Sequence, residues 1–413
     1  MRLINDLGHW IARQIHLRRR RAYGAGKQVV ADGVNAIASA GALLRGRKCK
    51  KPLVVLGRGV DETRLFRSLR ENELSWVAYS GVSVRPTVAD AEAICRIWWE
   101  EGCDSFAAMG EGPLLDVAKT AAACVAGRGR PVVGMAGYGK LPRRKPPVVL
   151  AIPTVAGSSA ESLARTTILD EQNKRLCLAG KNLIPELVVL DPALLEHTPR
   201  VDVAEAGMDG LCRAVEAYLT PGKGDEAARA MAAEAVRGFL ENLESCWNSG
   251  GTIYQRGALL EASRLAGAAA STLGYGYVRV LAQSAAEVAG LEFGSTGAVI
   301  LPYILEKYGN DAREKLAKLS EVSGVMTNGG QIQRAAAFIE RLRAMSFRMG
   351  FSDTLDGLAW DTAEEIAFLA SQDDRCFAPV FWSEDHCRAI FCALSVEEDK
   401  TLNTTTGEKL QWL

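Results

Sequence analysis

The sequence has little that would point to a disulfide framework, a membrane or a strongly charged partner. Its ten cysteines are scattered singly, with no Cys-x-x-Cys pair, which is typical of reduced and mostly buried thiols. No apolar run approaches the roughly 20 residues that a helix needs to span a bilayer. Lys and Arg together number 49, as do Asp and Glu, so no net charge favours nucleic acid or a membrane. We therefore expect a cytoplasmic protein.

The length and the hydrophobic pattern indicate two domains. With 413 residues, 48% of them hydrophobic, the chain can fill two cores. Strands are expected at 52–57, 76–81, 105–112 and 148–154, with helices at 60–72 and 88–102. This alternation predicts a parallel sheet covered on both faces. From about residue 201 the pattern is helical, so we place a boundary near residue 198, between an α/β half (24–198) and an all-helical half (199–413).

The first 23 residues form a separate leader. Apolar residues recur there at helical spacing and are followed by four consecutive arginines, 18–21. A secretory signal would carry its positive charge before the apolar region, so this order excludes one. The leader is either a docking helix for a protein partner or an anionic surface, or a helix packed on its own core with a solvated basic end.

A glycine turn, GEGPLLDVAK at 110–119, follows an expected strand and opens a helix. Small residues at such a turn let the backbone approach a pyrophosphate, and the helix N-terminus supplies free N–H groups. The charge of Glu111 would repel phosphate unless that side chain points away. A tight strand-to-helix connection explains the same residues equally well.

Several further motifs occur in a fixed order after this turn. They are PTVAGSSAE at 153–161, LIPELVVLDPALLEHTP at 183–199 and GMDGLCRAVEAY at 207–218, with additional matches at 83–94, 293–305 and 377–394. From about residue 24 onward the chain resembles the iron-containing (group III) alcohol dehydrogenase family, which is related to dehydroquinate synthase. The resemblance implies an N-terminal dinucleotide-binding α/β domain, an all-α C-terminal domain and an active site in the cleft between them. It also leads us to expect a homo-oligomer.

The resemblance implies a set of cofactor contacts. Residues that match the family's pyrophosphate motif are Gly110, Gly112, Asp116 and Lys119, and those that match its nicotinamide loop are Thr154, Val155 and Ser158. Many members carry an Asp for the adenosine ribose where Gly57 stands here, followed by Arg58. Exchanging a carboxylate for a guanidinium favours a 2′-phosphate, so NADPH is expected over NADH. The alternative is that Arg58 is a solvated turn residue.

The family's metal site is degenerate in this sequence. The resemblance places its one Asp and three His ligands at Asp209, Arg213, Arg279 and Phe293, and a proton-relay histidine at Gln283. Arginine is always protonated and cannot donate a lone pair to a metal. The four histidines of the chain, His9, His16, His197 and His386, lie outside these motifs. We therefore expect no catalytic metal.

The replacements predict an anion-binding pocket instead. Candidate catalytic residues are Arg213, Arg279, Gln283 and Arg175, the last of which matches a lysine that the family keeps near the cofactor. Guanidinium groups could orient a carboxylate or phosphate and polarise a carbonyl for hydride attack. Gln283 cannot supply a proton as an imidazolium would, and Tyr275 and Tyr277 are the nearest candidates in sequence.

Two functions stay open at this point. The first is an NAD(P)-dependent oxidoreductase that reduces an aldehyde or ketone without a metal, on an anionic substrate. The second is a catalytically inactive homologue that serves as a regulatory or assembly protein, with the arginines paired to Asp209, Glu161 or Glu216. A synthase of the dehydroquinate type is disfavoured, because that chemistry also depends on the bound metal.

Overall fold

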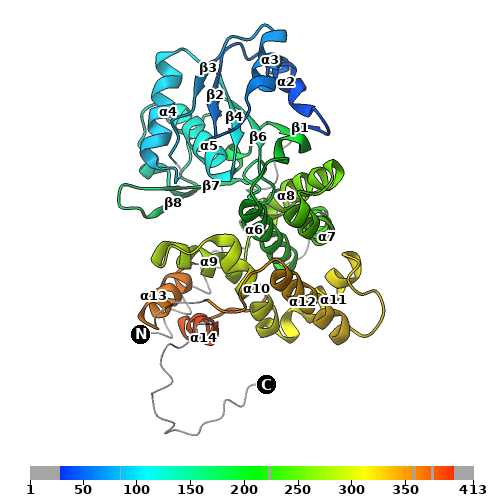
Figure 1. The fold of residues 1–413 in the computed structure, drawn as a ribbon. Coiled ribbons are helices and arrows are strands. Elements are labelled where there is room, and N and C mark those ends of the chain that lie inside the picture. Colours follow the sequence, from blue (N-terminus) through cyan, green and yellow to red (C-terminus); the bar gives the residue numbers. More distant parts are fainter. Residues whose placement is uncertain are drawn as a thin grey trace.

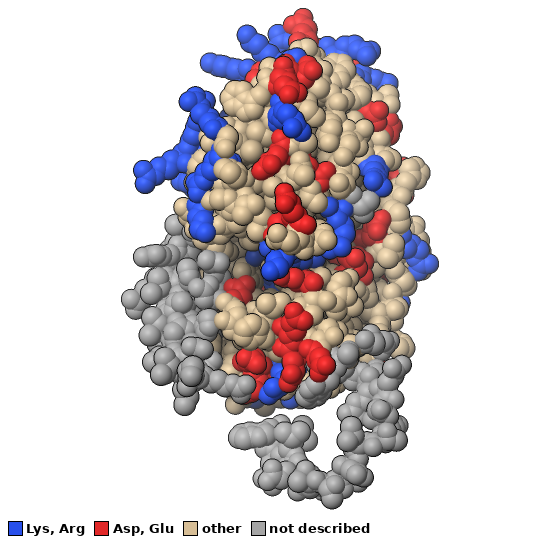
Figure 2. Space-filling view, turned by 90° about the vertical axis from the view of Figure 1, so that its left-hand side faces the viewer, with Lys and Arg blue, Asp and Glu red and all other residues tan. Residues whose placement is uncertain are grey.

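The computed structural model describes residues 28–83, 85–221, 225–355, 358, 360–373 and 376–394. The leader, residues 1–23, lies outside the described residues. An α/β domain and a helical domain are stacked end to end (Figure 1). On the face shown in Figure 2, acidic and basic side chains are interspersed. None of the described helices is long and apolar enough to cross a membrane.

The α/β domain is built on a six-stranded sheet in which every pair of neighbours is parallel, as the sequence predicted. The strand order is β1 (Val29–Asp32), β9 (Leu187–Leu190), β6 (Val148–Pro153), β4 (Ser105–Gly110), β2 (Pro52–Leu56) and β3 (Val77–Tyr79). Successive side chains of β2 pack into the hydrophobic cores on opposite faces of the sheet, because side chains alternate along a strand. Leu53 and Val55 pack on one face, whereas Val54 and Leu56 pack on the other.

Helices cover both faces of this sheet. Those on the face of Val54 are η2 (Ala36–Ser39), α2 (Ala40–Gly46) and α3 (Thr63–Glu71). Those on the face of Leu53 are α4 (Val88–Glu100) and α5 (Gly112–Gly127), together with η3 (Val132–Met135). The β-rich and helical stretches expected from the sequence are therefore confirmed, with ends shifted by a few residues.

A second, smaller sheet was not expected from the sequence. It consists of β5 (Gly137–Tyr138), β8 (Arg175–Ala179) and β7 (Arg165–Leu169); β7 and β8 are antiparallel, and β5 and β8 parallel. Figure 1 shows β7 and β8 at the end of the α/β domain that faces α9. This small sheet thus brings two arginines to the boundary between the domains.

The rest of the described chain is helical and shares one hydrophobic core. After η4 (Lys181–Leu183) and η5 (Pro192–Leu195), the helices are α6 (Arg200–Leu219), α7 (Glu226–Ser249), α8 (Ile253–Leu273), α9 (Tyr277–Val288), α10 (Phe293–Tyr308), α11 (Asn310–Val322), α12 (Gln331–Arg348), α13 (Trp360–Ser371) and α14 (Glu384–Leu394). The boundary proposed near residue 198 lies between η5 and α6.

Candidate functional site

The order of the strands reverses between β2 and β4, and this switch point is where a ligand crevice is expected. β2 and β4 are neighbours, but the helices that follow them, α3 and α5, cover opposite faces. In open parallel sheets, ligands bind beyond the carboxyl ends of two such strands. Gly57 and Gly110 follow and end these strands, and a Cβ atom on Gly57 would lie 3.2 Å from the Cα of Gly110. Glycine at both positions lets the two strand ends lie close together.

The start of α5 adds a third glycine to this crevice. A Cβ atom on Gly112 would lie only 2.4 Å from the Cβ of Ser158, so glycine is needed for the 157–158 loop to approach the helix. Helix N-termini leave N–H groups that can bind phosphate. Glu111 acts against this, because its carboxylate lies in the same turn. Partial desolvation and the nearby Asp202 raise the pKa of Glu111.

Two residues of the predicted pyrophosphate motif turn inward. Lys119 is 1% exposed, and its Nζ donates to the carbonyl oxygens of Ala160 at 2.8 Å and Arg165 at 2.9 Å. It also lies 3.2 Å from Asp116, whose other carboxylate oxygen accepts from the amide of Thr167 at 3.0 Å. Asp116 and Lys119 therefore fasten α5 to the segment that leads into β7.

The remaining predicted cofactor positions gather beside the glycine turn. The amide of Thr154 donates to the carbonyl of Gly110 at 3.1 Å, and Ser158 faces Gly112. Val155, between them in sequence, is buried. Arg58 is exposed just beyond β2. The fold thus brings Arg58, Thr154 and Ser158 to the same edge of the sheet as the three glycines.

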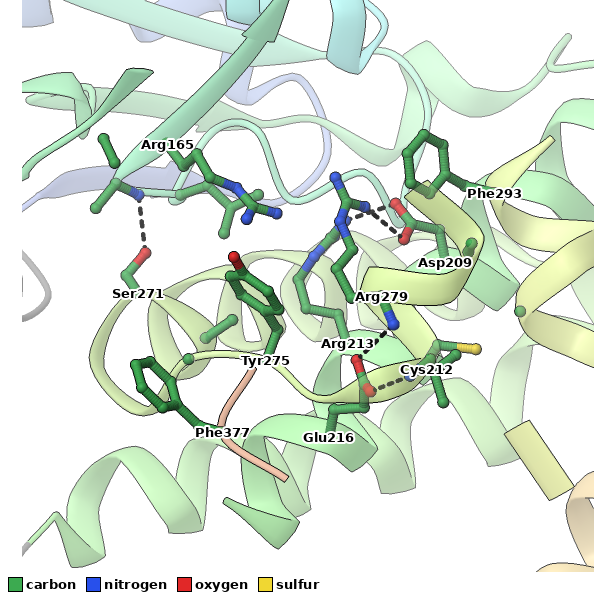
Figure 3. A pocket seen from close by; sticks show the side chains of 18 of the residues that line it. Arg165, Asp209, Cys212, Arg213, Glu216, Ser271, Tyr275, Arg279, Phe293 and Phe377 are labelled. Carbon is green, nitrogen blue, oxygen red and sulfur yellow. Dashed lines mark hydrogen bonds and ion pairs between the residues drawn. The ribbon is translucent and has the colours of Figure 1, made fainter. Parts of the chain in front are cut away.

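A cavity that is partly open to solvent lies between the two domains, and the empty space within it, open solvent included, is about 800 Å³. Its walls come from β7 and β8, from α6, α9 and α10, and from the end of α8 (Figure 3). Most of the lining is apolar, with Leu163, Ala164, Val278, Ala282 and Phe377 among the wall residues. A mainly apolar lining with a few charged groups is typical of a small-molecule site.

Arginines supply most of the charge in this cavity. Arg165, Arg213 and Arg279 line it, and Arg175 stacks on Phe293, which is also part of the wall. Asp209 is the carboxylate that these arginines contact directly: it lies 2.5 Å from Arg213 and 3.3 Å from Arg279. Three arginines and two acids, Asp209 and Glu216, line the cavity, so the local charge balance is positive, and Arg175 adds to it.

Arg213 is held on all sides by the protein. Its side chain is 6% exposed, and besides Asp209 it donates to the carbonyl oxygens of Gly157 at 2.9 Å and Ser158 at 2.7 Å. The 157–158 loop belongs to the α/β domain and α6 to the helical domain. Gly157 has a φ of +133°, and a Cβ there would lie 1.8 Å from the carbonyl oxygen of Ala206. Arg213 is therefore a tether between two closely packed domains.

Arg279 lines the cavity and is incompletely paired. Its side chain is 13% exposed, and its Nε has no hydrogen-bond partner among the described residues. Its guanidinium lies 4.3 Å from the centre of the Phe293 ring, and that of Arg175 lies 4.6 Å from the same centre. Burial, together with the nearby Arg165, lowers the pKa of Arg279 to about 10. The positive charge of Arg279 is therefore not fully balanced by the acidic groups around it.

The four positions do not fit a metal ion. Only Asp209 carries a donor lone pair, and both of its oxygens face guanidinium groups. Within the described residues, no three His, Cys, Asp or Glu side chains converge on a point that could hold a metal. Cys212 lines the cavity, but burial raises the pKa of its thiol well above the usual value, which opposes the thiolate form that binds metals. Gln283 is half-buried on α9 and is not among the residues that line the described cavity.

The two other acids expected to pair with the arginines have different partners. Glu216 is buried and accepts from the amides of Val278 at 2.7 Å and Arg279 at 3.1 Å, so it fixes the start of α9. Burial raises the pKa of Glu216 to about 7. Glu161 is also buried and accepts from the hydroxyl of Ser263 at 3.0 Å. Of the three acids, Asp209 is the one that forms ion pairs with Arg213 and Arg279.

A parallel α/β domain with a switch point between β2 and β4 is joined across a cavity to a helical domain, and solved structures of iron-containing alcohol dehydrogenases share this architecture. The iron-containing alcohol dehydrogenase family model matches residues 28–192, and the model of the C-terminal domain of the Fe-containing alcohol dehydrogenase family matches residues 203–392. The chain belongs to the iron-containing alcohol dehydrogenase family, as the sequence motifs predicted.

Individual relatives are distant but cover most of the chain. It is 28% identical to a 1,3-propanediol dehydrogenase of Citrobacter freundii, over 84% of this chain and 91% of that protein. It is 27% identical to lactaldehyde reductase of Escherichia coli K12, over 73% of this chain and 79% of that protein. Among solved structures, a 1,3-propanediol oxidoreductase superposes with a TM-score of 0.85 at 25% identity, over 90% of this chain and 99% of that one. The sulfoacetaldehyde reductase of Bifidobacterium kashiwanohense, in complex with NAD+, shares the fold with a TM-score of 0.81 at 19% identity, over 90% and 98%.

Proposed function

We propose that the protein is a nicotinamide-dependent reductase of a small anionic aldehyde or ketone, and that arginine side chains replace the family's metal ion. The observation that carries this proposal is the excess of guanidinium groups in a mainly apolar cavity. Arg165, Arg213 and Arg279 line it and Arg175 borders it, whereas Asp209 is the acid that they contact. Buried charge is costly unless it is paired, so an anionic ligand would be stabilised there.

The crevice beside the cavity supports a dinucleotide as the other ligand. Gly57, Gly110 and Gly112 would let the backbone approach a pyrophosphate, and the start of α5 would supply N–H donors. Arg58 would contact a 2′-phosphate, which favours NADPH over NADH. A bound nicotinamide supplies the hydride. Thr154 and Ser158 would lie on its side of the crevice, between the glycine turn and the cavity.

The arginines would divide the work in the cavity. Arg279 would hold the anionic group of the substrate and strengthen the polarisation of the carbonyl. Arg213 would keep the 157–158 loop against α6, a positioning role. Several relatives reduce short aldehydes, judging from names such as lactaldehyde reductase and sulfoacetaldehyde reductase, which supports a substrate of that size. We further propose a cytoplasmic homo-oligomer.

A catalytically inactive homologue is the competing proposal. The observation in its favour is that Arg213 and Asp209 use each other as partners, and that Gln283 stands outside the lining of the cavity. In that case the fold would act as a regulatory or assembly protein.

Titration of the purified protein with NADPH and then NADH, followed by nicotinamide fluorescence or calorimetry, tests both proposals. Saturable binding that is tighter for NADPH supports the reductase and the role of Arg58. Absence of binding by either nucleotide would refute the reductase and leave the inactive homologue.

A further inference from the structure

Reduction of a carbonyl leaves a negative charge on oxygen, which a proton must neutralise. We propose that the hydroxyl of Tyr275 donates this proton and that Asp373, which accepts from this hydroxyl at rest, holds the water that reprotonates it. This assignment rests on the proposed reductase function and adds to it a catalytic group. The family resemblance pointed to position 283 for proton relay, but Gln283 has no transferable proton and is not part of the described cavity lining.

The backbone holds Tyr275 in a defined position at the wall of the cavity. The residue lies between α8 and α9, and its carbonyl accepts from the amide of Phe377 at 2.7 Å. Gly274 precedes it with a φ of +91°, and a Cβ there would lie 2.2 Å from the Phe377 ring. Glycine is therefore required for the turn that sets the direction of Tyr275.

The hydroxyl of Tyr275 faces the charged part of the cavity. Figure 3 shows it turned toward the side chain of Arg165, whose guanidinium carbon lies 4.6 Å from the centre of the tyrosine ring. Arg165 in turn is close enough to Arg279 to contribute to its lowered pKa. A small substrate whose anionic group lies at Arg279 would thus have its carbonyl end within the part of the cavity that Tyr275 lines.

Asp373 connects this hydroxyl to the outside. The Tyr275 hydroxyl donates to a carboxylate oxygen of Asp373 at 3.1 Å, and Asp373 is half-buried. Water can therefore reach the carboxylate while the tyrosine stays at the wall of the cavity. This pair provides a path of two groups from solvent to substrate.

Proton transfer from the Tyr275 phenol to the substrate oxygen is favourable when the carbonyl is reduced. Hydride from the reduced nicotinamide forms a C–H bond at the carbonyl carbon, and the π pair moves to oxygen. That oxygen takes the proton of Tyr275 once the hydroxyl has turned away from Asp373. The resulting tyrosinate takes a proton from a water molecule at Asp373, which leaves hydroxide in the solvent. Burial, with Asp373, Tyr138 and Cys177 acting in the same direction and Arg165 against it, raises the pKa of Tyr275 well above its usual value. The phenol is therefore neutral at physiological pH, and an alkoxide is basic enough to deprotonate it.

Other acidic groups nearby are less suited. Tyr277 is buried and stacked on Trp382; its hydroxyl donates to the carbonyl of Trp382 and accepts from its amide, so it belongs to the core. Glu216 accepts from two amides at the start of α9. Tyr138 lines the cavity on β5 and is the alternative donor that an experiment must separate from Tyr275.

The test compares Tyr275→Phe with Tyr138→Phe and the core control Tyr277→Phe, using NADPH with glyoxylate and succinic semialdehyde as anionic probes. We expect Tyr275→Phe to lower kcat by about 10²–10³-fold with unchanged KM and unchanged NADPH binding, and Asp373→Asn to lower it less. Tyr277→Phe should lower the melting temperature without this loss of kcat. Full activity in Tyr275→Phe, or the same loss in Tyr138→Phe alone, would overturn the assignment while leaving the reductase function intact. No reduction by the wild-type protein would overturn both.

A second readout does not depend on turnover. Tyrosinate absorbance is followed as the pH rises, and the Tyr275→Phe curve is subtracted from that of the wild type. The difference curve reports the phenol of Tyr275, which should ionise with a pKa above the ordinary tyrosine value of about 10. Ionisation of that phenol at or below the ordinary value would contradict the role of Tyr275 as a neutral proton donor.

Discussion

Arg213 and Arg279 both contact Asp209, yet replacing each by methionine should have opposite consequences. Arg213→Met removes the donor to the carbonyls of Gly157 and Ser158 and the partner that lies 2.5 Å from Asp209. Taking one partner out of a buried charged network costs about 3–5 kcal/mol. With an unfolding entropy of about 2.1 cal/mol/K per residue, the melting temperature should fall by about 3–6 °C.

Arg279→Met should leave the stability unchanged or raise it. Burial and the neighbouring arginines lower the pKa of Arg279 to about 10, so its charge is destabilised where it lies. Arg213 still neutralises Asp209 after the substitution. What Arg279→Met should lose is the response to anions, because Arg279 lines the cavity and its buried Nε has no hydrogen-bond partner among the described residues.

Thermal melts with malonate, phosphate or chloride at constant ionic strength check both expectations. An anion present at about 100-fold its dissociation constant stabilises by about 2.7 kcal/mol, or about 3 °C for a chain of this length. Wild type and Arg213→Met should show this shift with malonate or phosphate, and Arg279→Met should not. Equal destabilisation by the two substitutions, with the anion shift retained in both, would refute the division of roles between the arginines.

Three further predictions concern the metal, the nucleotide and pH. Purified protein should contain substoichiometric iron and zinc by elemental analysis; a full equivalent of either that resists chelation would contradict the assignment of Arg213, Arg279 and Phe293. Arg58→Ala should weaken NADPH binding by about 10–100-fold, the value of a charge-assisted hydrogen bond, and leave NADH binding unchanged in the same titration. Because burial raises the pKa of Glu216 from 4.5 to about 7, the folded state holds this proton more tightly than the unfolded state. The stability that this group contributes is full below about pH 4.5 and is lost as the pH rises to about 7, so Glu216→Gln should flatten that part of a denaturant-midpoint profile.

The overall fold could be predicted because its signals are local. The strands β2, β4 and β6 are buried on both faces and read as continuous apolar runs, and the helices of the second half read as long Ala- and Leu-rich stretches. β7 and β8 were missed because each begins with an arginine and is only partly buried. Because the β7–β8 pair was not expected, no sequence pattern placed Arg165 in the cavity.

The sequence predicted which residues gather at the site better than it predicted what each of them does. The motifs placed Arg213 and Arg279 in one pocket, but only the fold shows that Arg213 is used by the 157–158 loop. Tyr275 and Tyr277 are two residues apart in GYGY, and no local pattern separates the wall of a cavity from a stack on Trp382. Lys119 looked like a phosphate ligand, and its burial depends on carbonyls more than 40 residues away.

The replacements at the former metal positions also bear on whether the cavity is active or dead. The family resemblance implies that residues at the positions of Asp209, Arg213, Arg279 and Phe293 bind one metal ion. In this chain those positions lie on α6, α9 and α10. Here Asp209 and Arg213 on α6 still meet Arg279 on α9, and Arg279 still meets Phe293 on α10, through ion pairs and a guanidinium–ring contact. Independent loss of ligands would leave side chains with no relation to one another. Because each of the four contacts at least one other and together they carry a net positive charge beside an apolar cavity, they support the proposed anion site and favour a reductase over an empty scaffold.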